Sequence, residues 1–136
     1  MKIENRDIYE QIGNLFYAIA DGQHVKPLEI AELKLLISKD WLPREDKKQS
    51  AVSAETHSIL TTMDVNEGDR LTGAEAFREF SKFYRINASL FTGELRQRIL
   101  TTAVEITNIF KSERPGENVH LLALKELLGT ADVQKV

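Results

Sequence analysis

Residues 15–37 read LFYAIADGQHVKPLEIAELKLLI. The stretch begins as the apolar end of one helix, passes through an Asp-Gly turn and opens a second helix at a proline. Gly22 lies just past the last apolar residue, where a glycine can take the left-handed conformation that closes a helix. Pro27 suits a first helical position because the amide there has no helical partner. The stretch therefore predicts a helix–turn–helix unit that the other helices cover.

Apolar residues recur at spacings of three and four along most of the chain, which is the pattern of helices with one buried face. The predicted helices cover about residues 5–21, 27–40, 53–63, 72–84, 92–110 and 118–128. No segment alternates apolar and polar residues between turn signals, as a strand would. We therefore expect an all-α, single-domain bundle of about six helices over residues 1–136, with a frayed tail from residue 129.

Several local signals set the predicted helix ends. Thr72 and Glu75 form a capping box, in which each side chain takes an unpaired amide of the first turn. Thr92 and Asn118 are the predicted caps of the last two helices, and Asp64–Arg70 is a predicted polar loop after Met63. The helix at 27–40 carries too many apolar residues for one narrow stripe, which predicts burial on two sides, and Trp41 at its end is a predicted core residue.

Composition narrows the classes of partner. The 136 residues are 42% hydrophobic and 29% charged, which is typical of a globular protein that folds unaided. The net charge of −3 includes no run of like charge, so we expect no nucleic-acid partner. The longest early apolar run, Leu15–Ala20, is too short for a membrane span. With no cysteine, a cytoplasmic protein is expected.

Ala18-Ile19-Ala20-Asp21-Gly22, followed by Val25, Glu29 and Leu33, resembles the signature of the TerB-like family of tellurite-resistance proteins. The aromatic stretch 77–84, Trp41-Leu42-Pro43 and Leu90-Phe91-Thr92 are also similar to stand-alone members. The resemblance implies a bacterial, all-α protein of pseudo-repeated helix pairs, a link to stress responses, and acidic residues as metal ligands. The strings AELKLL at 31–36 and ALKELL at 123–128 are a weak internal echo of such a repeat.

Two features depart from the family pattern. The turn after Asp21 is one residue longer, and residues 106–117, ITNIFKSERPGE, contain no Asp-Gly pair. A two-site metal scheme therefore does not carry over. The candidate that remains is one divalent-cation site with Asp21 and Glu29 as ligands, because such carboxylates suit calcium, magnesium or manganese. A simpler interpretation is that Asp21 is a turn residue and Glu29 faces the positive helix N-terminus. His24 between them is expected to be exposed.

Residues 64–75, DVNEGDRLTGAE, match a calcium-binding EF-hand loop at positions one, three and twelve. The sharp turn of that loop needs glycine at position six, where Asp69 stands. Position five is a glycine without a ligand atom, and Glu75 already belongs to the capping box. The sequence therefore favours helix capping and a surface loop over a calcium site.

No nucleophile elbow, phosphate-binding glycine loop or His-Glu-x-x-His motif occurs in the chain. Two classes of function remain. The first is a non-catalytic stress-response module that binds another protein or a second copy, with a divalent cation as candidate ligand. The second is an enzyme with a site in a cleft between helix pairs. Ionisable groups converging on a deep pocket would favour the enzyme, and a large exposed apolar patch would favour the module.

Overall fold

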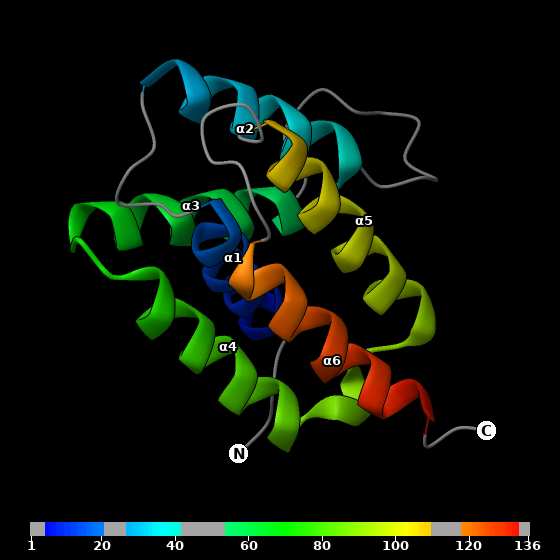
Figure 1. Ribbon diagram of the computed structural model, residues 1–136. Coiled ribbons are helices and arrows are strands. Elements are labelled where there is room, and N and C mark those ends of the chain that lie inside the picture. Colours follow the sequence, from blue (N-terminus) through cyan, green and yellow to red (C-terminus); the bar gives the residue numbers. More distant parts are fainter. Residues whose placement is uncertain (1–4, 21–26, 42–53, 110–117, 134–136) are drawn as a thin grey trace.

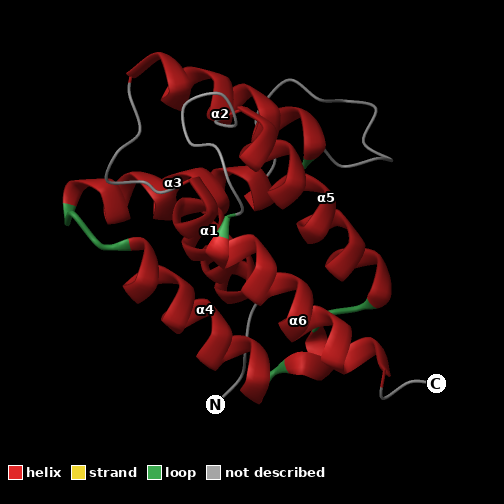
Figure 2. Cartoon of the chain, in the orientation of Figure 1, coloured by secondary structure: helices red, strands yellow, loops and turns green. Residues whose placement is uncertain are grey.

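A computed structural model describes residues 5–20, 27–41, 54–109 and 118–133, and all regular structure in these ranges is helical (Figure 2). This confirms the predicted all-α bundle. The helices are α1 (Asn5–Ala20), α2 (Pro27–Asp40), α3 (Ala54–Gly68), α4 (Gly73–Ile86), the 3-10 helix η2 (Ala88–Leu90), α5 (Gly93–Ile109) and α6 (Val119–Val133). Within the described ranges, none of them has both the length and the apolar composition that crossing a membrane requires.

Helix α1 lies at the centre of the bundle and is seen nearly end-on in Figure 1, with the other helices around it. It packs against α3 and α4 most extensively, and also against α5 and α6. The apolar residues that recur at spacings of three and four along α1 are all buried: Ile8, Ile12, Leu15, Phe16 and Ile19. Every residue from 15 to 20 is buried as well. Because the second half of α1 is buried on all sides, it forms the core over which the rest of the chain folds.

Trp41 closes the end of α2 and is fully buried, as predicted. Its indole Nε1 donates a hydrogen bond to Thr102 Oγ1 of α5 (3.1 Å), and its carbonyl oxygen accepts one from Thr56 Oγ1 of α3 (3.1 Å). The ring meets Tyr9 and Phe16 of α1 edge-on, with 6.0 Å between centroids in each case. Trp41, through its ring and its carbonyl oxygen, thus links the end of α2 to α1, α3 and α5.

The three predicted caps are confirmed. Thr72 Oγ1 accepts from the amide of Glu75 (3.0 Å), and Glu75 Oε1 accepts from the amide of Thr72 (3.0 Å). This hydrogen bond to the ionised carboxylate lowers the pKa of Glu75. Thr92 Oγ1 and Asn118 Oδ1 each accept from the amide three residues later, at 3.1 and 3.0 Å. The caps fix the starts of α4, α5 and α6.

The polar loop predicted over Asp64–Arg70 is wrong, because α3 continues to Gly68. Two residues past this end, Arg70 has a left-handed φ of 56°. The amide of Leu71 then bonds the carbonyl of Asn66 (3.0 Å), five residues back, as in a Schellman motif. The C-terminal end of α3 was not predicted, because an arginine, and not a glycine, takes the left-handed conformation after it.

Over residues 31–40, where its side chains are described, helix α2 is buried on one side, and not on two as predicted. Leu33 and Ile37 are 4% and 0% exposed, whereas the side chain of Leu35 between them is 73% exposed. The helix packs against α5 and less extensively against α3 (Figure 1). Its outer face therefore carries an apolar residue that the described residues do not cover.

Helix α6 runs through Gly129 to Val133, so the predicted end of the last helix before Gly129 is wrong. Glycine inside a helix costs only about 1 kcal/mol relative to alanine. The preceding residue, Leu128, is 3% exposed and packs in the core. The buried side chain of Leu128 fits a helix that continues through Gly129.

Candidate functional site

The predicted cation ligands lie where the structure gives no side-chain geometry. Asp21 and His24 are outside the described residues, and Glu29 lies in the first turn of α2, as predicted, with its side chain likewise outside them. Across the described ranges, no three His, Asp or Glu side chains come together as a metal site. Two carboxylates alone are fewer than the six to eight oxygen ligands that calcium takes. The cation site therefore stays a prediction.

The residues at 64–75 that match an EF-hand loop have structural roles in helix α3 and in the cap of α4. Its first five residues belong to α3. Asn66, at the third position, points inward, is 7% exposed and donates from Nδ2 to Asn14 Oδ1 of α1 (2.7 Å). Glu75, at the twelfth position, is held in the capping box with Thr72. The predicted capping box is confirmed, whereas the predicted surface loop is wrong for residues 64–68.

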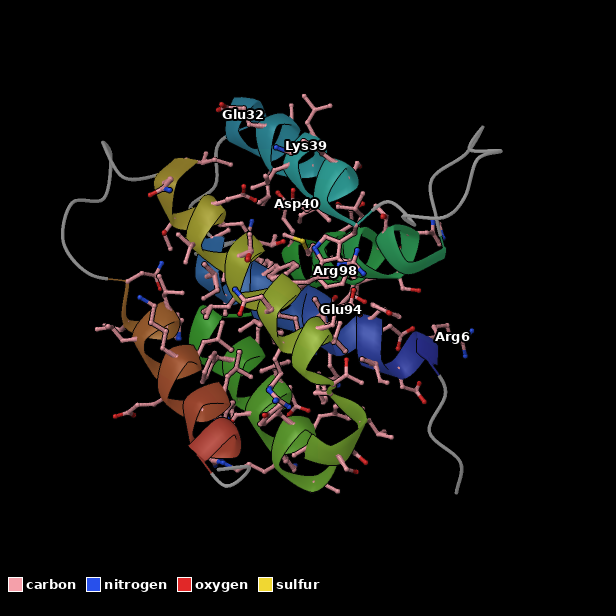
Figure 3. The ribbon with its side chains drawn as sticks, turned by 90° about the vertical axis from the view of Figure 1, so that its right-hand side faces the viewer. Arg6, Glu32, Lys39, Asp40, Glu94 and Arg98 are labelled. Atoms are coloured by element: carbon pink, nitrogen blue, oxygen red, sulfur yellow. The ribbon has the colours of Figure 1, made fainter. Side chains whose placement is uncertain are left out.

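A polar cluster lies between the end of α2 and the middle of α5, and Figure 3 shows Asp40 and Arg98 facing one another across it. Arg98, Thr102 and Glu105 share one face of α5, since their spacing of four and three matches the helical turn. Thr102 Oγ1 donates to Asp40 Oδ2 (3.1 Å). Arg98 Nη2 donates to the carbonyl oxygen of Asp40 (3.1 Å), and its guanidinium lies 4.3 Å from the Trp41 ring centroid.

Glu105 completes this cluster as the partner of Asp40. A hydrogen bond between the two carboxyl groups raises the pKa of Glu105, and burial and the charge of Asp40 raise it further. Lys39 opposes these effects. Glu105 Oε1 is buried and accepts no hydrogen bond from the described residues. Asp40 of α2 and Glu105 of α5 thus form a further polar contact between these helices, which is favoured when Glu105 is protonated.

A second candidate is an open groove along α4 that the start of α6 borders, with a volume of about 670 Å³. We call it the α4–α6 groove. Its lining residues are Ala74, Phe77, Arg78, Ser81, Lys82, Arg85, Ile86 and His120. The lining thus combines three cations and an imidazole with apolar side chains, and none of these eight residues is acidic. Ile86 is 76% exposed.

The two faces of α4 explain this composition. On the inner face, Ala76, Phe80 and Tyr84 recur every four residues and are buried. On the outer face, Arg78 and Lys82 are one turn apart, and Arg85 follows three residues later. Because residues at these spacings lie on one side of a helix, the core packing of α4 presents the three cations together.

His120 of α6 forms the wall of the groove against α4. Its imidazole stacks on the Phe77 ring, with centroids 5.3 Å apart and planes inclined by 29°. A Cβ atom at Gly73 would lie 3.2 Å from His120 Nε2, so the glycine permits this close approach. Asn118, the α6 cap, donates from Nδ2 to the carbonyl oxygen of Ile19 (2.9 Å). The wall is therefore anchored to the end of the central helix.

Sequence reasoning missed this groove because it searched for consecutive like charges. The cations at 78, 82 and 85 are separated by other residues, including the acidic Glu79. Basic residues that recur at spacings of three and four are the signal in the sequence that predicts the basic face of α4. The contribution of His120 depends on a contact 43 positions away from Phe77 (120 − 77), which no local pattern reports.

Comparisons of the chain with protein-family models, with characterised proteins and with solved structures find no match. The resemblance to the TerB-like family therefore rests on the residues quoted for it and stays a prediction.

Proposed function

We propose that this chain is a non-catalytic helical interaction module of TerB-like type, which acts in the bacterial cytoplasm as part of a stress response. It binds another protein at the α4–α6 groove. One observation carries the proposal: the open groove places three cations and the exposed Ile86 on the outer face of a helix whose inner face is core. Exposed apolar surface bordered by charge is typical of protein-binding sites.

The ionisable groups of the groove favour binding over catalysis. General acid–base chemistry needs groups placed to give and take a proton near the substrate. The titratable side chains that line the groove are those of Arg78, Lys82, Arg85 and His120, and no carboxylate is among them. The carboxylate of Glu75, whose charge interacts with Arg78, is held in the capping box with Thr72. His120 is stacked on Phe77. This set suits the attraction of an anionic surface.

The alternative, an enzyme with a site between helix pairs, would need a different cluster. The polar cluster of Asp40 and Glu105 contains no histidine. Its hydroxyl group, Thr102 Oγ1, is engaged with Trp41 and Asp40 on both sides. The contacts of the cluster are thus between helices, which supports a role in packing.

A photo-crosslinking residue at the groove tests the proposal in living bacterial cells. Benzoylphenylalanine replaces Ile86 in one variant and Val65 of α3, which is 54% exposed, in a control. We expect a discrete covalent adduct from position 86 only. The adduct should disappear when Arg78→Glu and Arg85→Glu are added. Identical adducts from both positions, or an adduct that survives the charge reversal, would contradict the groove as the docking face.

A further inference from the structure

We propose that the occupant of the α4–α6 groove is an acidic amphipathic helix of about three turns, supplied by a partner protein. This inference rests on the proposed function and specifies the chemistry of its partner. It is argued from the charge of the groove, the spacing of its cations and its apolar residues.

The charge of the groove is opposite to that of the whole chain. The chain carries a net charge of −3, whereas the groove is lined by Arg78, Lys82 and Arg85. A locally positive surface on an acidic protein selects a negative partner and repels most of the protein's own surface. The occupant should therefore present carboxylates to α4.

The spacing of the cations fits a helix. Arg78 and Arg85 are seven residues apart, which is a rise of roughly 10 Å along α4 at about 1.5 Å per residue. Carboxylates at positions i, i+4 and i+7 of a partner helix have the same spacing and lie on one face. From Ala74 to Ile86 the groove follows about three turns of α4, which sets the length of the occupant.

The apolar residues of the groove distinguish a helix from a general polyanion. Phe77 and Ala74 line the groove beside the cations, and Ile86 is 76% exposed at one end. An amphipathic helix covers such residues with its own apolar stripe while its acidic edge meets the cations. A nucleic acid would pair phosphates with the cations and leave Ile86 uncovered, so it gains less from this surface.

Fluorescence anisotropy with the full chain tests this inference. The probe is a labelled synthetic helix with Glu at i, i+4 and i+7 and a leucine stripe beside them. Peptides with the same composition in scrambled order, and with Lys in place of Glu, are the references. We expect the acidic helix to bind about tenfold or more tightly than either reference and to weaken with added salt.

Two triple variants of equal net charge separate the groove from general electrostatics. Arg78→Gln, Lys82→Gln and Arg85→Gln should weaken binding about tenfold or more. The control variant replaces three cations that lie outside the groove, Arg6, Lys34 and Lys125, by Gln. It should weaken peptide binding less than about twofold. Circular dichroism during urea unfolding verifies that both variants fold.

Four results would overturn the inference. They are equal binding of the acidic and scrambled peptides, equal loss in the two triple variants, tighter binding of an oligonucleotide of the same charge, and self-association through the groove in sedimentation. If the crosslink from position 86 forms while the acidic helix does not bind, the occupant is wrong and the docking face stands. If the crosslink itself fails, the proposed function fails.

Discussion

The indole of Trp41 donates a hydrogen bond from Nε1 to Thr102 Oγ1 across 3.1 Å, between two side chains that are 0% and 1% exposed. The same hydroxyl donates to Asp40 Oδ2 (3.1 Å). One oxygen atom therefore accepts from the residue that closes α2 and donates to the last residue of that helix. This pair of hydrogen bonds joins α2 to the middle of α5.

Replacing Thr102 by valine keeps the shape of the side chain and removes its hydroxyl. The buried Nε1 of Trp41 then loses its acceptor, which costs about 1–3 kcal/mol of the free energy of unfolding. Thr102→Ser, which keeps the hydroxyl, is the control and should lose less. Urea unfolding of the two variants measures the difference, and equal stabilities would show that the hydrogen bond contributes nothing.

Gly13 of α1 lies directly against α3. A Cβ atom there would lie 2.7 Å from the carbonyl oxygen of Ile59 and 2.8 Å from Thr62 Cβ. Gly13→Ala should therefore destabilise the protein, because overpacking costs about 1–3 kcal/mol, more than the roughly 1 kcal/mol that alanine gains in a helix.

Gly129 provides the matched control for this substitution. It lies inside α6 with nothing within 4 Å of an added Cβ atom. Gly129→Ala should therefore raise the melting temperature, since only the helix propensity of about 1 kcal/mol changes. Melting curves that rise for both variants would contradict the close approach at Gly13.

The contact between Asp40 and Glu105 should strengthen on acidification. The pKa of Glu105 is raised in the folded protein above its ordinary value of 4.5, first by the hydrogen bond with Asp40 and then by burial. The folded state therefore holds this proton more tightly than the unfolded state. The stabilisation is complete below the unfolded pKa and is lost as the pH rises through the raised folded pKa.

Glu105→Gln keeps a donor to Asp40 at every pH. We therefore expect this variant to gain stability relative to the wild type as the pH rises from about 4 to about 7. Denaturant unfolding at several pH values measures the difference. Glu67→Gln, an exposed site on α3, is the control. A constant difference between Glu105→Gln and the wild type would contradict the raised pKa of Glu105.

The cation site predicted at Asp21 and Glu29 is tested on metal-stripped protein. Calcium, magnesium and manganese are titrated by calorimetry into the wild type and into a double variant with Asp21→Ala and Glu29→Ala. A ligand that binds only the folded state raises the melting temperature, so the site predicts heat and a higher melting temperature that the variant loses. If all three ions leave the wild type unchanged, the site does not exist.

The spacing of apolar residues and the capping residues predict the buried face and the first residues of several helices. The caps at Thr72, Thr92 and Asn118 are confirmed because each depends on neighbours within one turn. The buried faces of α1 and α5 are confirmed because apolar residues at helical spacing form one side, which the other helices cover. The end of α3 escaped prediction for the opposite reason. Asn66 continues the buried stripe of Ile59 and Met63, yet a polar residue there reads as surface unless its partner on α1 is known.

Of the candidate sites too, only those formed by residues close in sequence could be predicted. The capping box alone accounts for Glu75 in the EF-hand match, and this was predictable from four consecutive residues. The groove requires knowledge of which side of α4 is core and of where α6 begins. Leu35, exposed although its neighbours at 33 and 37 are buried, shows that an apolar residue is likewise assigned to core or surface by distant helices.

Mapping of amide chemical shifts by NMR tests the central claim most directly. The acidic amphipathic helix is titrated into isotope-labelled full-length protein. We expect the largest shifts on α4 and on the first turn of α6 around His120. These shifts should vanish in the Arg78→Gln, Lys82→Gln, Arg85→Gln variant. Shifts that centre on α2 and α3, or that persist in this variant, would contradict a binding site in the α4–α6 groove.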